Sequence, residues 1–280
     1  MTIASPANHA QLDLGFARRG ERTVMARRLF AWPFVLTRSF ALDTVPAHML
    51  TVIVQTSSGA VHGEDRLIQR IRVATGAAAH VTTQGATAVH RAHPGFTSRE
   101  AIKLDVAPGG ELEFLQEPRI LFPEAALDQT VEIEVAPSGA AIIADAFTVH
   151  DPAGEHRPFR RLTSSTVLTR AGDPAVIDRL DIAALPRRRA VRFEAFGTVL
   201  LALPDSFAMC DELARTLTER LGSLGDLYGA ASPLPMRAGV GIRLAAPDLR
   251  SVRAGIKATW TAYRLALHGV APADRRSSAT

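Results

Sequence analysis

The chain has 280 residues, which suffice for one large domain or two small ones with a core that needs no covalent cross-links. The lone Cys210 excludes a disulfide framework and a cysteine-based zinc site, and with neither a signal peptide pattern nor an apolar run of membrane-spanning length we expect a cytoplasmic protein. The net charge of +4 comes from scattered arginines with few aromatic residues between them, a pattern that argues against nucleic-acid binding and favours a mildly basic face for acidic partner proteins.

The first segment with candidate chemistry is the glycine-rich stretch SSGAVHGEDRL (57–67). It brings His62, Glu64 and Asp65 into one short turn. Imidazole and carboxylate groups are ligands that suit nickel, zinc or manganese. Two interpretations stay open: a transient metal contact, and a glycine-rich turn whose polar side chains only face solvent.

Between residues 70 and 169 the sequence alternates apolar and polar residues, as half-buried strands do. The alternating runs are RIRV (70–73), IKLDV (102–106), LEFL (112–115), VEIEV (131–135) and TVLT (166–169). The first, second and fourth end at Val73, Val106 and Val135, each followed by Ala and a glycine-bearing turn, and a weaker copy covers 166–182. This repetition predicts a mainly β protein of stacked hairpins or β-layers, each burying a face that it could not bury alone.

The stretch HVTTQGATAVHRA (80–92) is too polar for a core strand and lacks the charge clustering of a solvated tail. It is interpreted as a site, as a strand end with its turn, or as a surface that touches a partner. In the second case the hydroxyls of Thr82 and Thr83 satisfy the backbone of the turn. His90 and His93 lie three residues apart, a spacing that fits either a metal pair or two solvated loop imidazoles.

Two later segments have the period of an amphipathic helix. The first, 205–222, has a cap signal at Asp205 or Ser206 and stops at Gly222. The second, 247–269, opens on Pro247 and ends at Gly269. Their apolar stripes are Cys210, Leu213, Leu217 and Leu221 in the first, and Leu249, Val252, Ile256, Trp260, Tyr263 and Leu267 in the second. We expect the basic residues of the second, Arg250, Arg253, Lys257 and Arg264, to lie mostly outside its stripe.

Motifs of known catalytic chemistry are missing from the sequence: a phosphate-binding Gly-x-x-x-x-Gly-Lys-Ser/Thr loop, a Gly-x-Ser-x-Gly elbow and a His-Glu-x-x-His helix. The run AGVGIRLAA (238–246) contains a Gly-x-Gly, but it lacks a third glycine, so it is interpreted as a strand. Residues 271–280 have the composition of a disordered tail.

Four blocks of the chain, in this order and spacing, resemble the urease accessory protein family UreD, called UreH in some bacteria. They are 15–29, 59–92, 110–125 and 241–269. The most specific part is the central block, in which a Gly-rich turn with Asp65 leads through a strand to Thr82, Thr83 and Gln84. The Gln-Glu-Pro stretch at 116–118 is a second anchor. The resemblance covers Leu12 to Gly269, so residues 1–270 are expected to form a single UreD-like domain.

The resemblance implies a β-rich fold with two helices and a non-enzymatic chaperone-like scaffold. Family members bind apo-urease together with the accessory protein UreF and the GTPase UreG, and help to insert nickel. They are proposed to pass nickel through an internal polar channel, so no stably bound cofactor is expected, only nickel in transit. Asp65, Thr82, Thr83, Gln84 and Glu117 are then candidates for this path or for partner contact. His62, Glu64 and Asp65 are candidates for transient metal contact.

The chain departs from the family pattern at the glycine-rich turn, where His62 and Glu64 replace glycines, and after Gln84, where the usual lysine and aromatic residue are missing. These departures indicate a diverged paralogue. Two rival functions stay open: a β-rich enzyme for small molecules that uses Asp65, His62 or Glu117, and a protein-interaction module unconnected with nickel whose contact is the basic C-terminal helix.

Overall fold

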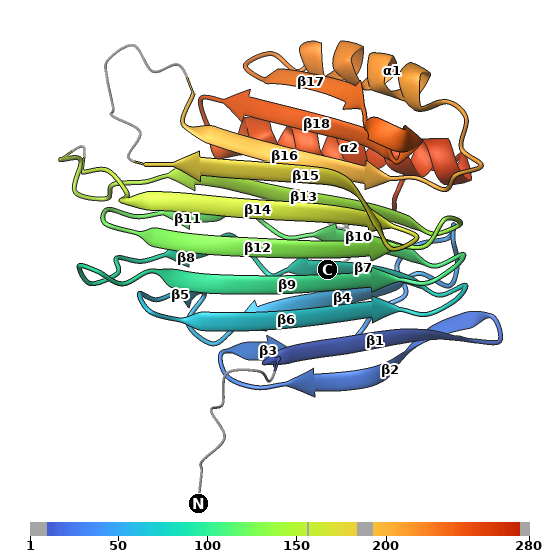
Figure 1. The fold of residues 1–280 in the computed structure, drawn as a ribbon, viewed down its shortest axis with the longest axis horizontal. Coiled ribbons are helices and arrows are strands. Elements are labelled where there is room, and N and C mark those ends of the chain that lie inside the picture. Colours follow the sequence, from blue (N-terminus) through green and yellow to red (C-terminus); the bar gives the residue numbers. More distant parts are fainter. Residues whose placement is uncertain (1–9, 156, 184–192, 275–280) are drawn as a thin grey trace, which may run out of the picture.

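A computed structural model of the protein describes residues 10–155, 157–183 and 193–274. Two β-sheets pack face to face, and two helices cover the outer face of one of them (Figure 1). The first sheet has seven strands in the order β15 (Asp173–Ile182), β14 (Arg161–Arg170), β12 (Ala126–Val135), β9 (Ser98–Val106), β6 (Arg66–Val73), β1 (Leu12–Arg19) and β2 (Arg22–Phe30).

The second sheet has eleven strands. Its main path is β17 (Tyr228–Pro233), β18 (Gly239–Ala246), β16 (Ala195–Ala202), β13 (Ala140–Val149), β10 (Glu111–Leu115), β7 (Ala78–Thr83), β4 (Leu50–Thr56) and β3 (Phe34–Leu36). Three short strands form its side branch: β5 (Ala60–Val61), β8 (Thr87–Val89) and β11 (Arg119–Leu121).

The centre of the molecule is a stack of rungs that confirms the predicted β-layers. Each of the first three rungs runs through one strand of the second sheet, one short strand and one strand of the first sheet: β4–β5–β6, β7–β8–β9 and β10–β11–β12. Equivalent strands of successive rungs pair in parallel, and Val73, Val106 and Val135 lie side by side as their repetition predicts. The fourth copy also stacks, because β14 pairs in parallel with β12.

The strands on either side of each repeated turn do not form the predicted hairpins. The turn after Val73 carries the chain from β6 in the first sheet to β7 in the second, so the strands it connects do not pair with each other. The turns themselves stack instead: the amide of Ala107 donates to the carbonyl of Val73, and that of Ala136 to Val106. Antiparallel hairpins close the first sheet at its two edges, where β14 pairs with β15 and β1 with β2.

Both predicted helices are present in the C-terminal part. Helix α2 (Leu249–His268) begins at Asp248, whose side chain accepts a hydrogen bond from the amide of Ser251, and ends at the left-handed Gly269. Helix α1 (Cys210–Gly222) begins later than its expected cap, because Asp205 pairs with Arg170 and its amide with the carbonyl of Pro137. Cys210 is a buried core residue, and 238–246 coincides with strand β18.

The core has two parts that meet at the second sheet. One fills the space between the sheets, and the other lies between the second sheet and the two helices. The short helix Pro235–Arg237 precedes β18. Of the expected tail at 271–280, residues 275–280 lie outside the described residues, while the amide of Ala273 donates to the Asp43 carboxylate.

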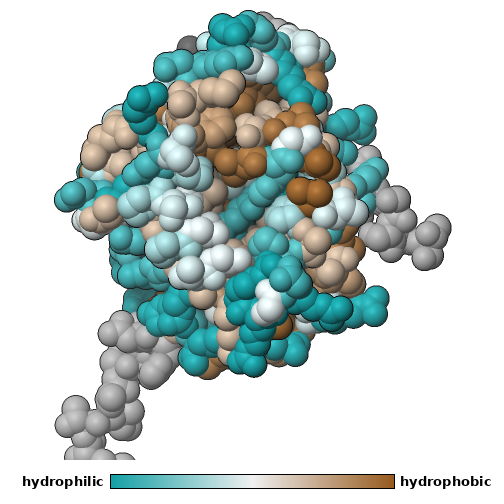
Figure 2. Space-filling view, turned by 90° about the vertical axis from the view of Figure 1, so that its right-hand side faces the viewer, coloured by the Kyte–Doolittle hydropathy of each residue, from teal (hydrophilic) through white to brown (hydrophobic). Residues whose placement is uncertain are grey.

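One end of the molecule presents an apolar surface over its upper half, where the helices and the C-terminal strands lie (Figure 2). Large exposed apolar side chains of the C-terminal part are Met209, Tyr228, Met236, Leu265 and Val270. Within the described residues no helix has the length and apolar character needed to cross a membrane.

Gly239 opens β18 where the chain passes closest to its neighbour. Its φ is +141°, and a Cβ there would lie 1.7 Å from the carbonyl oxygen of Leu201. We therefore expect Gly239→Ala to prevent accumulation of soluble folded protein. Gly222→Ala is the matched control: it lies at the end of α1 with no atom within 4 Å, and it should leave thermal stability unchanged or raise it by up to about 1 kcal/mol. Equal yields and melting temperatures for both variants would contradict this account of β18.

Candidate functional site

A connected group of polar side chains crosses the interior between the two sheets, in a region otherwise apolar. We call it the polar belt; its members are Gln69, Glu100, Arg119, Gln129, Asp145 and Ser164. Glu100, Gln129 and Ser164 occupy the same register on neighbouring strands β9, β12 and β14. The stacked rungs therefore place three polar groups in one row, facing into the molecule.

Arg119 on β11 connects the two ends of the polar belt. It donates to the Glu100 carboxylate and, over 2.7 Å, to Asp145 Oδ1. Burial alone would lower the pKa of Arg119, but the neighbouring carboxylates of Glu100 and Asp145 outweigh it and raise the pKa, so the guanidinium stays charged. Two carboxylates against one guanidinium leave the belt with a formal charge of −1.

The polar belt reaches the surface at Asp145. This side chain is 31% exposed and also accepts from Gln129 Nε2 at 2.9 Å. It lines a small recess of about 30 Å³ with Ser164, Thr166, Asp178 and Arg243, between the C-terminal strands of the two sheets. At the other end of the belt the side-chain oxygen of Gln69 is buried without a hydrogen-bond partner in the described part of the chain. The belt thus forms an oxygen-rich row that runs along the stack and opens to solvent.

A second buried polar cluster lies between the second sheet and α2, and we call it the helix clamp: Asp43, His80, Glu113, Trp260 and Arg264. The Glu113 carboxylate accepts from Trp260 Nε1 at 2.7 Å and from Arg264, and it lies 2.7 Å from His80 Nδ1. Arg264 also contacts Asp43 and the carbonyl of Val45. Arg264 was expected outside the apolar stripe of α2, but its side chain is fully buried because Glu113 and Asp43 match its charge.

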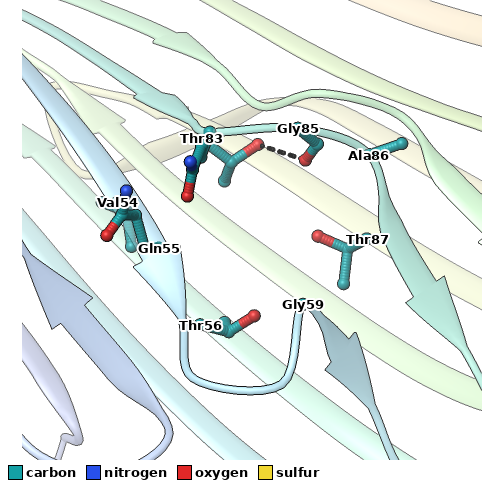
Figure 3. A pocket seen from close by; sticks show the side chains of 9 residues that line it. Val54, Gln55, Thr56, Gly59, Thr83, Gly85, Ala86 and Thr87 are labelled. Carbon is teal, nitrogen blue, oxygen red and sulfur yellow. Dashed lines mark hydrogen bonds between the residues drawn. The ribbon is translucent and has the colours of Figure 1, made fainter.

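The Thr-Thr-Gln run ends strand β7 at a corner of the stack. Thr82 Oγ1 donates to the carbonyl of Leu115, and Thr83 Oγ1 accepts from the amide of Glu117. Both hydroxyls therefore tie the strand end to the next rung. Thr83 and Gln84 also line a pocket of about 210 Å³, together with Gln55, Thr56 and Thr87 (Figure 3). Glu117 points to α2, where it pairs with Arg253 at 2.6 Å.

The glycine-rich stretch contains the short strand β5 and then turns into β6 of the first sheet. Asp65 Oδ2 accepts from the amide of His62 at 2.9 Å, so the carboxylate caps its own turn, and Glu64 adopts the left-handed φ of 81°. The His62 ring stacks on His90, with ring centroids 5.2 Å apart. Asp65 stands at the start of β6 in the first sheet, whereas Thr82 and Thr83 belong to the second sheet.

No group of three or more His, Cys, Asp or Glu side chains in the described ranges is arranged to hold a metal ion. Nor do the residues of the rival enzyme interpretation converge on one another. His62 and Asp65 share a turn, but Glu117 faces α2.

Sequence reasoning missed the polar belt, although a signal was present. In SREAIKLDV (98–106) Glu100 occupies the register of Ile102 and Leu104, and in 126–135 Gln129 occupies that of Val131. A polar residue in the apolar register of consecutive repeats marks an inward-facing polar row. The clamp was also missed, because Arg264 looks solvent-facing when α2 is considered alone.

Comparison with known proteins gives a consistent result. The family model described as "UreD urease accessory protein" matches residues 8–279. Urease accessory protein UreD 2 of Bradyrhizobium sp. strain BTAi1 is 51% identical over 91% of this chain and 89% of its own length. UreD 1 of Methylorubrum extorquens strain PA1 is 36% identical over 95% and 91%. UreD 1 of the same Bradyrhizobium strain is 30% identical over 98% and 96%.

The helix clamp should make the free energy of unfolding depend on pH in the acid range. Burial would raise the pKa of Glu113, but hydrogen bonds from His80 and Arg264 outweigh it and lower the pKa from 4.5 to about 2. The stabilisation that the ionised Glu113 gives to the folded protein is therefore complete above about pH 4.5 and is lost as the pH falls towards 2. We expect Glu113→Gln to cost about 3–5 kcal/mol at pH 7 and to reduce the loss of stability between pH 4.5 and 2.

Chemical denaturation as a function of pH measures both effects. Glu132→Gln, an exposed change of the same type on β12, is the control and should behave as wild type. If the Glu113 variant keeps the wild-type acid dependence, the clamp is not its source.

Proposed function

The chain belongs to the UreD family of urease accessory proteins, which are non-catalytic maturation factors, and from this membership we propose that it is a cytoplasmic scaffold that assists nickel insertion into apo-urease. The proposal includes a UreF-like protein and a UreG-like GTPase as partners in the assembly. The absence of a phosphate-binding loop in the sequence is in keeping with a GTPase supplied by a partner.

The observation that carries the nickel part of this proposal is the polar belt. Nickel in transit needs ligands that replace its hydration without trapping it, and carboxylate, amide and hydroxyl oxygens bind it more weakly than imidazole or thiolate. The belt supplies such oxygens in an apolar surrounding, with a formal charge of −1 and an opening at Asp145. We place the path of the ion along this belt.

The other candidate residues fit supporting roles in the same proposal. Thr83 and Gln84 line an uncharged pocket of mixed polar and apolar character at a corner of the stack, which suits contact with a partner. Thr82 ties two rungs together. Asp65, with its carboxylate already capping a turn, is proposed to hold the shape of this corner, with His62 and Glu64 as weak, transient metal contacts at most.

Asp145→Asn tests the path. Asparagine keeps the size of the side chain and one acceptor for Arg119 but removes the negative charge at the opening. We expect urease activity and nickel content to fall several-fold in cells that co-express urease and its accessory proteins. The amount of variant recovered with its partners should stay at the wild-type level. Normal nickel content with normal complex recovery would rule out the belt as the path.

A pair of variants at Asp65 separates turn capping from metal contact. Asp65→Asn retains an acceptor for the His62 amide but removes the charge, whereas Asp65→Ala removes both. We expect the Asn variant to activate urease normally and the Ala variant to lose about 1 kcal/mol of stability, as for a lost side-chain cap. Thermal unfolding and the same activation assay measure this. Equal loss of activation in both variants, at wild-type stability, would instead assign Asp65 to the nickel path.

A further inference from the structure

The outer face of the first sheet carries a concentrated positive charge on β2, β1, β6 and β9, the strands in the lower half of Figure 1. We call this surface the basic face. Its charged members are Asp13, Arg19, Arg22, Arg27, Arg66, Arg70, Arg72, Arg99, Lys103 and Asp105, all on outward positions of their strands. Eight cations and two anions give a formal charge of +6, against a net charge of +4 for the whole chain. The remainder of the molecule therefore sums to −2.

Parallel pairing places like charges next to each other on this face. Arg66 lies beside Arg99, and Arg70 beside Lys103, on the neighbouring strands β6 and β9. Like charges on adjacent strands destabilise a sheet. Asp13 binds Arg27 and Arg72 at 2.6 and 2.5 Å, and Asp128 and Glu132 of β12 lie beside Arg99 and Lys103, so acidic neighbours offset part of this repulsion. The cations of the face still outnumber the acidic groups beside them, so a negatively charged surface laid over β2, β1, β6 and β9 would be attracted to it.

An apolar anchor adjoins the basic face. Leu29 on β2 lies opposite Asp13 and shares the outer face with it, whereas Phe30 occupies the register of the buried Leu12 at the edge of the sheet. Leu29 and Phe30 are about 40% exposed, and Trp32, just beyond them, is 69% exposed. Tryptophan and arginine are the residues that most often carry the binding energy of protein interfaces. Proteins that bind single-stranded nucleic acid stack its bases on aromatic side chains placed among the cations. The cationic strands β6 and β9 have no aromatic residue, which argues against such a ligand here.

We propose that the basic face, with Trp32 as its anchor, docks an acidic protein surface that has an apolar recess for the indole ring. Its place in the maturation assembly rests on the function proposed above. The acidic stripe of β12 next to it, with Asp128, Glu132 and Glu134, would limit the docked surface to β2, β1, β6 and β9 and fix its orientation by repulsion.

The test is capture of the urease subunits and accessory proteins of the source cell, co-expressed with the tagged chain, at 0.15 M salt. We expect Arg70→Glu/Lys103→Glu to reduce capture at least about tenfold, and wild-type capture to weaken as salt rises. Trp32→Ala should reduce capture while leaving the relative effect of salt unchanged. Arg250→Glu/Lys257→Glu, the same change of charge on exposed positions of α2, should keep capture at the wild-type level.

Thermal unfolding should show every variant to be folded, because all five side chains lie at the surface. The Arg70/Lys103 variant should melt somewhat lower, since its new carboxylates lie beside Asp13 and Glu132. Full capture by the Arg70/Lys103 variant, or loss only in the α2 variant, would overturn the inference while the proposed function stands. Failure of the wild-type chain to capture any of these proteins would count against both. Tight binding of a fluorescent DNA duplex at the same salt, lost in the Arg70/Lys103 variant, would show that the face binds nucleic acid and would also overturn it.

Discussion

In-register parallel pairing is the constraint on which the rest of this molecule depends. It places the same position of each rung next to its equivalent in the neighbouring rungs, as the alignment of Val73, Val106 and Val135 shows. Side chains at the same repeat position of successive rungs therefore form a row across the sheet. Apolar positions give a continuous core, polar inward positions give the belt, and cationic outward positions give a charged face. A single substitution in one rung changes a row and not an isolated contact.

The helix clamp and the polar belt are two buried polar clusters that differ in their access to solvent. The helix clamp is closed: Glu113 and Arg264 are inaccessible to solvent, and their charges are matched at short distance. Such pairs fix one arrangement of elements more than they add stability. The polar belt has the same ratio of two carboxylates to one guanidinium, but it opens to solvent at Asp145, which is 31% exposed.

The alternating runs and the two helical stripes were enough to predict the fold class, since periodicity depends only on which side of an element is buried. They could not distinguish a hairpin from a rung, because a turn after Val73 looks the same whether the next strand returns alongside or crosses to another sheet. The burial of Arg264 could not be predicted from the sequence for a related reason. Its partners, Glu113 and Asp43, are about 150 and 220 residues away in the sequence, and no local pattern reports a contact of that span. Glu100 was within reach, as a charged residue in an apolar register.

The distance in sequence between the members of the helix clamp also bears on how the chain is made. While the ribosome is adding the residues between Glu113 and the last helix, the carboxylate has His80 as its only early partner in the clamp, since Trp260 and Arg264 come last. The rungs can stack in order of synthesis, but the outer face of the second sheet stays uncovered until α2 emerges. The nascent protein therefore spends most of its synthesis with the apolar outer face of this sheet exposed, and its folding is completed only when the final turns of α2 leave the ribosome.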